Sequence, residues 1–319
     1  MKIRNRKLNP IRKLKPIKIK PLIKPGRKKR KLQYIAVLPS LVTLMNGLCG
    51  FLAIILASRG PDMVWIPHLL PDVSISYFAL AGYLIFLAMV ADVLDGHVAR
   101  ISKTTSSFGA QLDSLCDAIS FGAAPAFLML KLVEIYSYRL QIGAGIFDLF
   151  FNRAVFFIAI IYAMCAVIRL ARFNVENGEN KDESGRISFA GLPSPAAAGA
   201  VVSMIVFQQD FLPKIADWPG GYFNFFEVAT VWCLPVITLL AGLLMVTRIP
   251  YPHIVNHFLT GKKRFSTFLI VLFTLLFMIW NIQLAMVLGF CLFMLFGIVR
   301  KLLSPLLLRY KKELKQDIE

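Results

Sequence analysis

Runs of about twenty apolar residues recur along the chain, and they constrain its fold more than any other feature. Hydrophobic residues make up 57% of the 319 residues, and the mean hydropathy is +0.65, which is too apolar for a soluble domain of this size. The sequence therefore predicts an all-α, polytopic bundle of about eight transmembrane helices. The expected spans are 34–58, 76–97, 110–133, 154–173, 194–212, 227–247, 265–281 and 283–303.

Basic residues are unevenly distributed, and their distribution predicts the orientation of the bundle. The first 31 residues contain fifteen Lys and Arg and no acidic residue, which accounts for most of the net charge of +18. Cytoplasmic segments are enriched in Lys and Arg, so this tail is expected to stay in the cytoplasm. The basic residues of the later loops agree with this start, and we expect both chain ends to face the cytoplasm.

The basic tail itself has no long apolar core and no small-residue cleavage site, so it is not expected to be a signal peptide. Two interpretations remain open. The tail is only an orientation signal, or it also adheres to anionic lipid, at about 1 kcal/mol per basic residue near the surface. Nucleic acid is not expected as a partner, because the first aromatic residue is Tyr34, which leaves the tail no base-stacking platform.

Four aspartates lie where two apolar segments meet a short basic loop. Asp92 and Asp95 are three residues apart, and Asp113 and Asp117 are four apart, so each pair shares one face of a helix. An Asp at the centre of a membrane helix costs about 2.5–3.5 kcal/mol, and four unpaired ones would cost on the order of 10 kcal/mol. Carboxylates without His or Cys form a hard oxygen site for Mg²⁺ or Mn²⁺. This predicts a site for two ions that bridge a diphosphate.

The residues around the aspartates favour this hypothesis without excluding its alternatives. Gly96 and Gly109 lie one helical turn from acids on the same faces and lack the Cβ that would keep a ligand from the backbone. Ala99 extends that smooth surface. One alternative is that the acids are structural and pair with Arg100, Lys103 or neighbouring polar groups. Another is a cation transporter with carboxylates along its pathway. We find no Walker loop, dinucleotide fingerprint or nucleophile elbow, so the chemistry is expected to be metal-based.

The segment from Asp92 to Asp117 resembles the complete signature of the CDP-alcohol phosphotransferases, membrane enzymes that move a phosphatidyl or related group from a CDP-linked donor to an alcohol. Its eight matching positions are Asp92, Asp95, Gly96, Ala99, Arg100, Gly109, Asp113 and Asp117. The resemblance implies a six-span core over residues 33–247. Outside that core we expect a basic cytoplasmic tail over 1–32, two additional spans within 248–304 and a charged cytoplasmic tail over 305–319.

The resemblance also implies roles for individual residues. Asp92, Asp95 and Asp113 would bind the metal, and Asp117 would contact the metal and act as the general base. The CDP pocket would be formed by Asn46, Asp92, Gly96, Ala99, Arg100 and Gly109. For Asn46, a hydrogen bond between helices is the alternative. CDP-diacylglycerol is the implied donor, two ions of Mg²⁺ or Mn²⁺ are the implied cofactors, and a homodimer is the implied assembly.

Three further segments concern the acceptor alcohol. Residues 38–51, 169–174 and 189–198 are similar to segments of phosphatidylserine synthases of the membrane-embedded type, which implies L-serine as the acceptor, phosphatidylserine and CMP as the products, and a bacterial cytoplasmic membrane as the location. Arg169 or Arg172 would hold the serine carboxylate bidentately, and the alternative for each is contact with lipid headgroups. Glycerol 3-phosphate, inositol phosphate and choline remain alternative acceptors.

Overall fold

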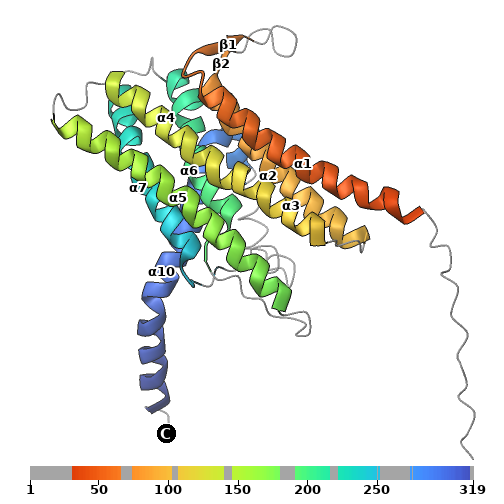
Figure 1. Ribbon diagram of the computed structural model, residues 1–319. Coiled ribbons are helices and arrows are strands. Elements are labelled where there is room, and N and C mark those ends of the chain that lie inside the picture. Colours follow the sequence, from red (N-terminus) through yellow and green to blue (C-terminus); the bar gives the residue numbers. More distant parts are fainter. Residues whose placement is uncertain are drawn as a thin grey trace, which may run out of the picture.

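The computed structural model describes residues 31–65, 74–102, 107–139, 146–179, 191–215, 222–249, 251, 274 and 276–316. These residues form a bundle of long helices with one short antiparallel ribbon at one end (Figure 1). The elements are α1 (Lys31–Ala57), β1 (Met63–Trp65), β2 (Ser74–Ser76), α2 (Tyr77–Ser102), α3 (Ser107–Asp117), η1 (Ala118–Ala123), α4 (Ala124–Arg139), α5 (Ile146–Glu179), α6 (Ser194–Val206), η2 (Phe207–Phe211), η3 (Leu212–Ile215), α7 (Tyr222–Val246) and α10 (Ile282–Gln316).

The predicted all-α polytopic bundle is confirmed. Within the described part of the chain, seven helical segments are long and apolar enough to cross a membrane, and each overlaps a predicted span. They are Ser40–Ala57, Tyr77–His97, Phe108–Arg139, Leu149–Glu176, Ser194–Lys214, Phe225–Val246 and Ile282–Lys301. The expected span 265–281 lies mostly outside the described residues, as does the basic tail before residue 31. The β1–β2 ribbon was not predicted, since its strands have only three residues each.

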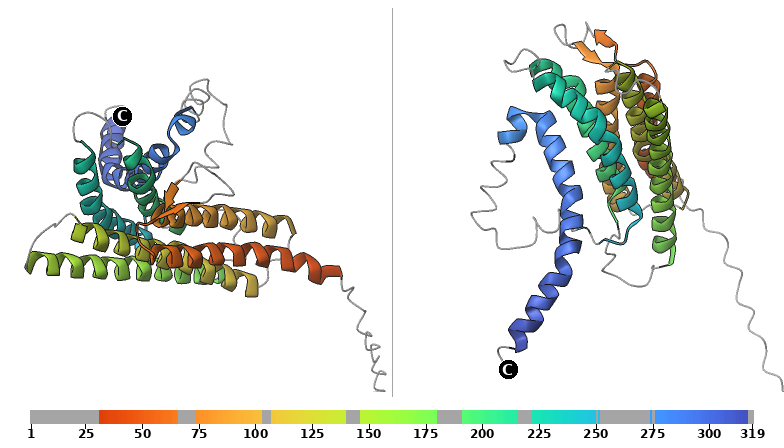
Figure 2. Two further views of the ribbon diagram at one scale, coloured as in Figure 1. Left: turned by 90° about the horizontal axis from the view of Figure 1, so that it is seen from above. Right: turned by 90° about the vertical axis from the view of Figure 1, so that its left-hand side faces the viewer.

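Helix α6 lies at the centre of the bundle and contacts α2, α4, α7 and α10. Helix α10 lies on one side of the bundle, and its C-terminal half extends beyond the other helices (Figure 2). The sequence of α6 explains its position. Pro193 and Pro195 fit the first turn of a helix, and a run of small buried residues follows them: Ala197, Ala198, Gly199 and Ala200. Small side chains let neighbouring membrane helices approach closely, so α6 can be covered on several sides.

Helix α1 packs against α2, α3 and η1, and one glycine makes the contact with η1 possible. A Cβ atom at Gly50 would lie 2.4 Å from the Ser120 Oγ and 2.6 Å from its Cα, so no other residue fits without moving η1. The Ser120 hydroxyl donates a hydrogen bond of 2.8 Å to the backbone carbonyl of Asn46, one turn earlier on α1. This close contact fixes α1 against the helical segment that carries Asp113 and Asp117.

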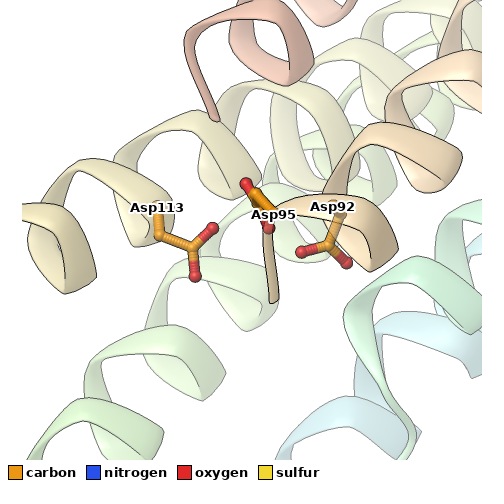
Figure 3. Close-up of side chains that lie close together, drawn as sticks. All are labelled: Asp92, Asp95 and Asp113. Atoms are coloured by element: carbon orange, nitrogen blue, oxygen red, sulfur yellow. The ribbon is translucent and has the colours of Figure 1, made fainter. Parts of the chain in front are cut away.

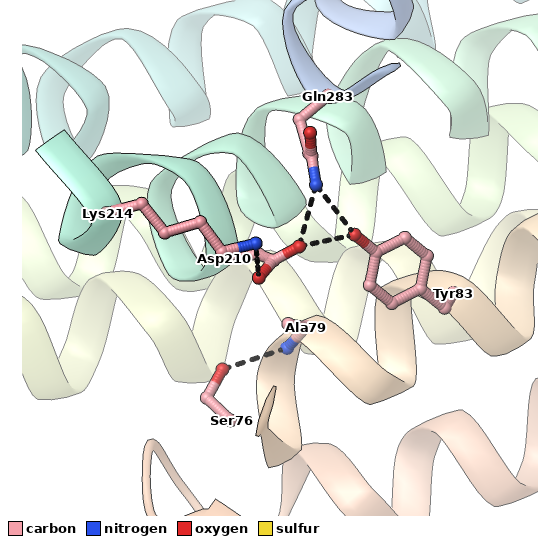
Figure 4. A network of polar contacts seen from close by, with 6 residues as sticks. All are labelled: Ser76, Ala79, Tyr83, Asp210, Lys214 and Gln283. Carbon is pink, nitrogen blue, oxygen red and sulfur yellow. Dashed lines mark hydrogen bonds and ion pairs between the residues drawn. The ribbon is translucent and has the colours of Figure 1, made fainter. Parts of the chain in front are cut away.

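A polar cluster that the sequence analysis did not predict lies close to the start of α2 (Figure 4). The Asp210 carboxylate of η2 accepts hydrogen bonds from the Tyr83 hydroxyl of α2 at 2.6 Å and from the Gln283 amide of α10 at 2.8 Å. Its other oxygen lies 2.8 Å from the Lys214 Nζ. The carboxylate therefore joins the last described helix to α2 and to the end of the α6 span.

Replacing Asp210 with alanine is expected to lower the free energy of unfolding by about 1–3 kcal/mol, because the Tyr83 and Gln283 donors would lose their acceptor in a largely apolar site. Thermal unfolding of the purified protein in detergent measures this loss. Lys214→Ala is the control. The Lys214 side chain is 61% exposed, so its loss is expected to change stability by no more than about 1 kcal/mol. Equal effects of the two substitutions would contradict the prediction.

Candidate active site

The two predicted pairs of aspartates come from helices that both pack on α1. Asp92 and Asp95 lie near the end of α2, while Asp113 and Asp117 lie in the last two turns of α3. Because α1 contacts α2 and α3 alike, it brings the two pairs to one side of the bundle. Because each pair lies on one face of its helix, the acids of α2 can face those of α3.

Three of the four carboxylates converge. Asp92, Asp95 and Asp113 each offer one oxygen, and these oxygens all lie within 4.8 Å of one another (Figure 3). Three negative charges at this distance, largely shielded from water, repel one another strongly unless cations or protons neutralise them. The arrangement therefore requires a positively charged partner whenever all three groups are ionised.

The donor atoms of this cluster fit a divalent cation. The Asp95 Oδ2 and the Asp113 Oδ1 are buried and have no hydrogen-bond partner among the residues that the structure describes. Buried acceptors without partners are rare and costly, so two such atoms in one cluster indicate a ligand. The set consists only of carboxylate oxygens, which hard ions such as Mg²⁺ and Mn²⁺ prefer. The structural alternative, pairing with Arg100 or Lys103, concerns side chains outside the described part.

Asp117 lies next to this cluster, and a residue of α1 orients its carboxylate through a hydrogen bond. It ends α3 at the point where the π-helical turn η1 begins, a type of turn that is often found at functional sites. Its Oδ1 accepts a hydrogen bond of 2.9 Å from the side-chain amide of Asn46, which is completely buried. The hydrogen bond between helices, the alternative considered for Asn46, is therefore present. One oxygen of the Asp117 carboxylate is fixed by α1.

The smaller residues of the signature lie along the same helices. Gly96 is exposed, and among the described residues a Cβ atom there would meet nothing within 4 Å. Gly109 lies in the first turn of α3 and is partly exposed. Ala99 and Arg100 belong to the last turns of α2, and their side chains lie outside the described part. Roles of these four residues in CDP binding stay predictions.

The two arginines of α5 have different surroundings. The Arg169 Nη1 donates a hydrogen bond of 2.8 Å to the Ser194 Oγ, and its guanidinium interacts electrostatically with Asp117 and Asp92. Arg172 instead lies 3.6 Å from a carboxylate oxygen of Glu176 and donates to the backbone carbonyl of Val246 at 3.3 Å. Arg169 therefore lies close enough to the acidic cluster to interact with two of its carboxylates.

Two further residues of this site were missed in the sequence. Thr43 hydrogen-bonds to Asp95 through its side chain, and Ser194 binds Arg169. Both lie in segments already singled out, 38–51 and 189–198. Thr43 also precedes Asn46 by three residues on α1, so the two side chains share the helix face that meets the acids. That spacing was the available signal.

Comparisons with known proteins agree with this geometry. The model of the CDP-alcohol phosphatidyltransferase family matches residues 36–239, which include all four aspartates and both arginines. Three relatives carry the name CDP-diacylglycerol–serine O-phosphatidyltransferase. The one from Helicobacter pylori is 31% identical over 223 residues, which is 70% of this chain and 80% of the relative. The one from Methanocaldococcus jannaschii is 29% identical over 70% of this chain and 77% of the relative. The one from Saccharomyces cerevisiae is 34% identical over 51% of this chain and 51% of the relative.

The family match covers more than half of the chain, and the H. pylori relative is matched over most of its length. The resemblance inferred from the aspartate signature and from the three other segments is therefore confirmed. The seven apolar helices place the protein in a membrane. The chain belongs to the CDP-alcohol phosphatidyltransferase family and is an integral membrane transferase of phospholipid synthesis.

Proposed function

We propose that the chain transfers the phosphatidyl group of CDP-diacylglycerol to the hydroxyl of L-serine, giving phosphatidylserine and CMP. The observation that carries the choice of serine is the position of Arg169, a half-buried guanidinium that interacts with the acidic cluster. Serine brings a carboxylate as well as a hydroxyl, and a guanidinium binds a carboxylate bidentately. The names of the relatives support the same acceptor.

Asp92, Asp95 and Asp113 are proposed to hold two divalent ions, Mg²⁺ or Mn²⁺, with Asp117 completing the set. When bound, such ions neutralise the pyrophosphate of the donor and stabilise the charge on CMP as it leaves. The rest of the donor would lie along α2 and α3. Gly96 is exposed on α2 and lacks a Cβ, which lets a nucleotide approach the backbone there. Ala99, Arg100 and Gly109 are proposed to line the same pocket, together with Asn46.

Asp117 is proposed as the general base. Its Oδ1 is occupied by Asn46, which orients the carboxylate and leaves the second oxygen to accept a proton. In the reaction, the serine oxygen forms a bond to the phosphatidyl phosphorus while the bond from that phosphorus to the CMP oxygen breaks. The hydroxyl proton passes to Asp117. Positioning by Asn46 and Arg169 supplies the alignment that this exchange requires.

The arrangement is less suited to the other acceptors. Glycerol 3-phosphate or inositol phosphate brings a doubly charged phosphate, which calls for more cations than Arg169, and Arg172 already contacts Glu176 and the end of α7. Choline calls for an aromatic cage.

We also propose that the active site and both chain ends face the cytoplasm of a bacterium, and that the protein forms a homodimer. The basic segment before residue 32 and the positive-inside rule support that orientation.

Purified protein incubated with CDP-diacylglycerol, Mg²⁺ or Mn²⁺ and one alcohol at a time tests this function. Release of CMP and formation of phosphatidylserine are expected with serine and not with the other alcohols. Release with another alcohol alone would keep the family and overturn serine as the acceptor. No release with any alcohol, together with metal flux into sealed proteoliposomes, would support the cation transporter instead.

A further inference from the structure

We propose that Ser194 is a positioning residue that holds Arg169 for the acceptor carboxylate, and that it thereby contributes to the choice of serine over alcohols without a carboxylate. This inference rests on the proposed function, since it assigns a role to a residue that contacts the acceptor only through Arg169. Ser194 is the first residue of α6 and is almost completely buried. Its hydroxyl accepts a hydrogen bond of 2.8 Å from the Arg169 Nη1.

The position of Ser194 is fixed by the end of α7. The backbone N–H of Gly191 donates to the Ile249 carbonyl at 2.9 Å, and the N–H of Leu192 donates to the Leu244 carbonyl at 3.1 Å. The Leu244 carbonyl is among the last four of α7, which have no backbone partner within the helix, and Ile249 lies three residues after α7 ends. The segment before α6 is therefore attached to the last turn of α7 and to the residues that follow it, two and three residues before Ser194.

Gly191 makes this attachment possible. Its φ of +97° lies in the left-handed region that favours glycine, and a Cβ atom there would lie 2.5 Å from the Met245 carbonyl oxygen. Pro193 has its own φ fixed by its ring, restricts Leu192 before it, and directly precedes α6. The path from residue 191 to residue 194 has little freedom, and the Ser194 hydroxyl occupies a defined place opposite α5.

The fixed position of the Ser194 hydroxyl matters for the orientation of Arg169, because an arginine side chain is long and flexible. It has about 2 kcal/mol of rotamer entropy to lose on being fixed, and a guanidinium orients a carboxylate only when its own plane is fixed. One hydrogen bond to Ser194 uses a single N–H and leaves most of the fork for the acceptor. Arg172, one turn further along α5, is attached to the same end of α7 through the Val246 carbonyl.

Ser194→Ala tests the proposal with two acceptors, L-serine and serinol, in which a hydroxymethyl group replaces the carboxylate. The KM for serine is expected to rise about 10-fold, the effect of losing one hydrogen bond to a charged group. The KM for CDP-diacylglycerol and the kcat/KM for serinol are expected to stay unchanged, because neither depends on the Arg169–carboxylate contact. Ser194→Thr, which keeps the hydroxyl, is expected to retain the lower KM for serine.

Ser203→Ala is the matched control. Ser203 lies on the same helix, is completely buried, and its hydroxyl donates only to the Ala200 carbonyl one turn earlier in α6. The Ser203→Ala variant is expected to have unchanged KM and kcat values with both serine and serinol. Equal kinetics of Ser194→Ala and Ser203→Ala would overturn the inference, and so would an equal loss with serine and serinol, which marks a purely structural role. If the unaltered enzyme releases CMP with another alcohol but not with serine, the proposed function itself fails.

Discussion

Replacing Asp117 with asparagine is expected to abolish CMP release while the protein stays folded and inserted. Asparagine has the same shape, and its carbonyl oxygen can still accept the hydrogen bond from Asn46 that Asp117 accepts now. It cannot take the proton of the serine hydroxyl. A positioned general base contributes about 10²–10⁴ in rate, so kcat is expected to fall by at least that factor. The KM for serine is expected to change far less than kcat.

Steady-state CMP release, with gel filtration and thermal unfolding of the same preparations, measures this effect. Asp210→Asn is the matched control, since it makes the same change to another carboxylate within the bundle, one that bonds Tyr83 and Gln283 rather than the candidate site. That variant is expected to keep most of its activity. Retention of a large part of kcat by Asp117→Asn would remove Asp117 as the base and leave Asn46 with a structural role alone.

Helical spacing predicted most of the aspartate site. The offsets of three and four residues placed each pair of acids on one face, and the apolar runs fixed the helices that carry them. Spacing within one helix does not predict which residue of another helix a side chain contacts. Asn46 and Asp117 are separated by 71 residues, and only the contact of α1 with α3 joins them. The role of Asn46 beside Asp117 therefore remained one of two alternatives.

The parts that the sequence did not predict depend on packing between distant segments. Asp210 was not singled out, because nothing near it in the sequence resembles a site, while its partners Tyr83 and Gln283 are 127 and 73 residues away. Ser194 was recognised only as part of a similar segment. Its contact with Arg169 follows from the attachment of residues 191 and 192 to α7, which is a backbone interaction that side-chain patterns do not encode.

Asp113→Asn is expected to have opposite effects on stability with and without divalent metal. Asp92, Asp95 and Asp113 place three carboxylate oxygens within 4.8 Å of one another, so without a cation their repulsion opposes folding. Neutralising one of them relieves that repulsion, and the variant is expected to unfold at a higher temperature than the unaltered protein in EDTA. Activity is expected to be lost in either condition, because the ligand set is incomplete.

With Mn²⁺ the order is expected to reverse. A ligand that binds only the folded state stabilises it by RT ln(1 + [L]/Kd), about 2.7 kcal/mol at one hundred times Kd, and Asp113→Asn forfeits most of this gain. Thermal unfolding in EDTA and in a Mn²⁺ series measures both halves of the prediction. Lys131→Ala, which removes an exposed ion pair with Glu134, is expected to show the Mn²⁺ shift of the unaltered protein. If the acids were instead neutralised by basic side chains of the protein, Asp113→Asn would lower stability in both conditions and Mn²⁺ would shift neither protein, an outcome that would replace the metal site with a structural ion-pair network.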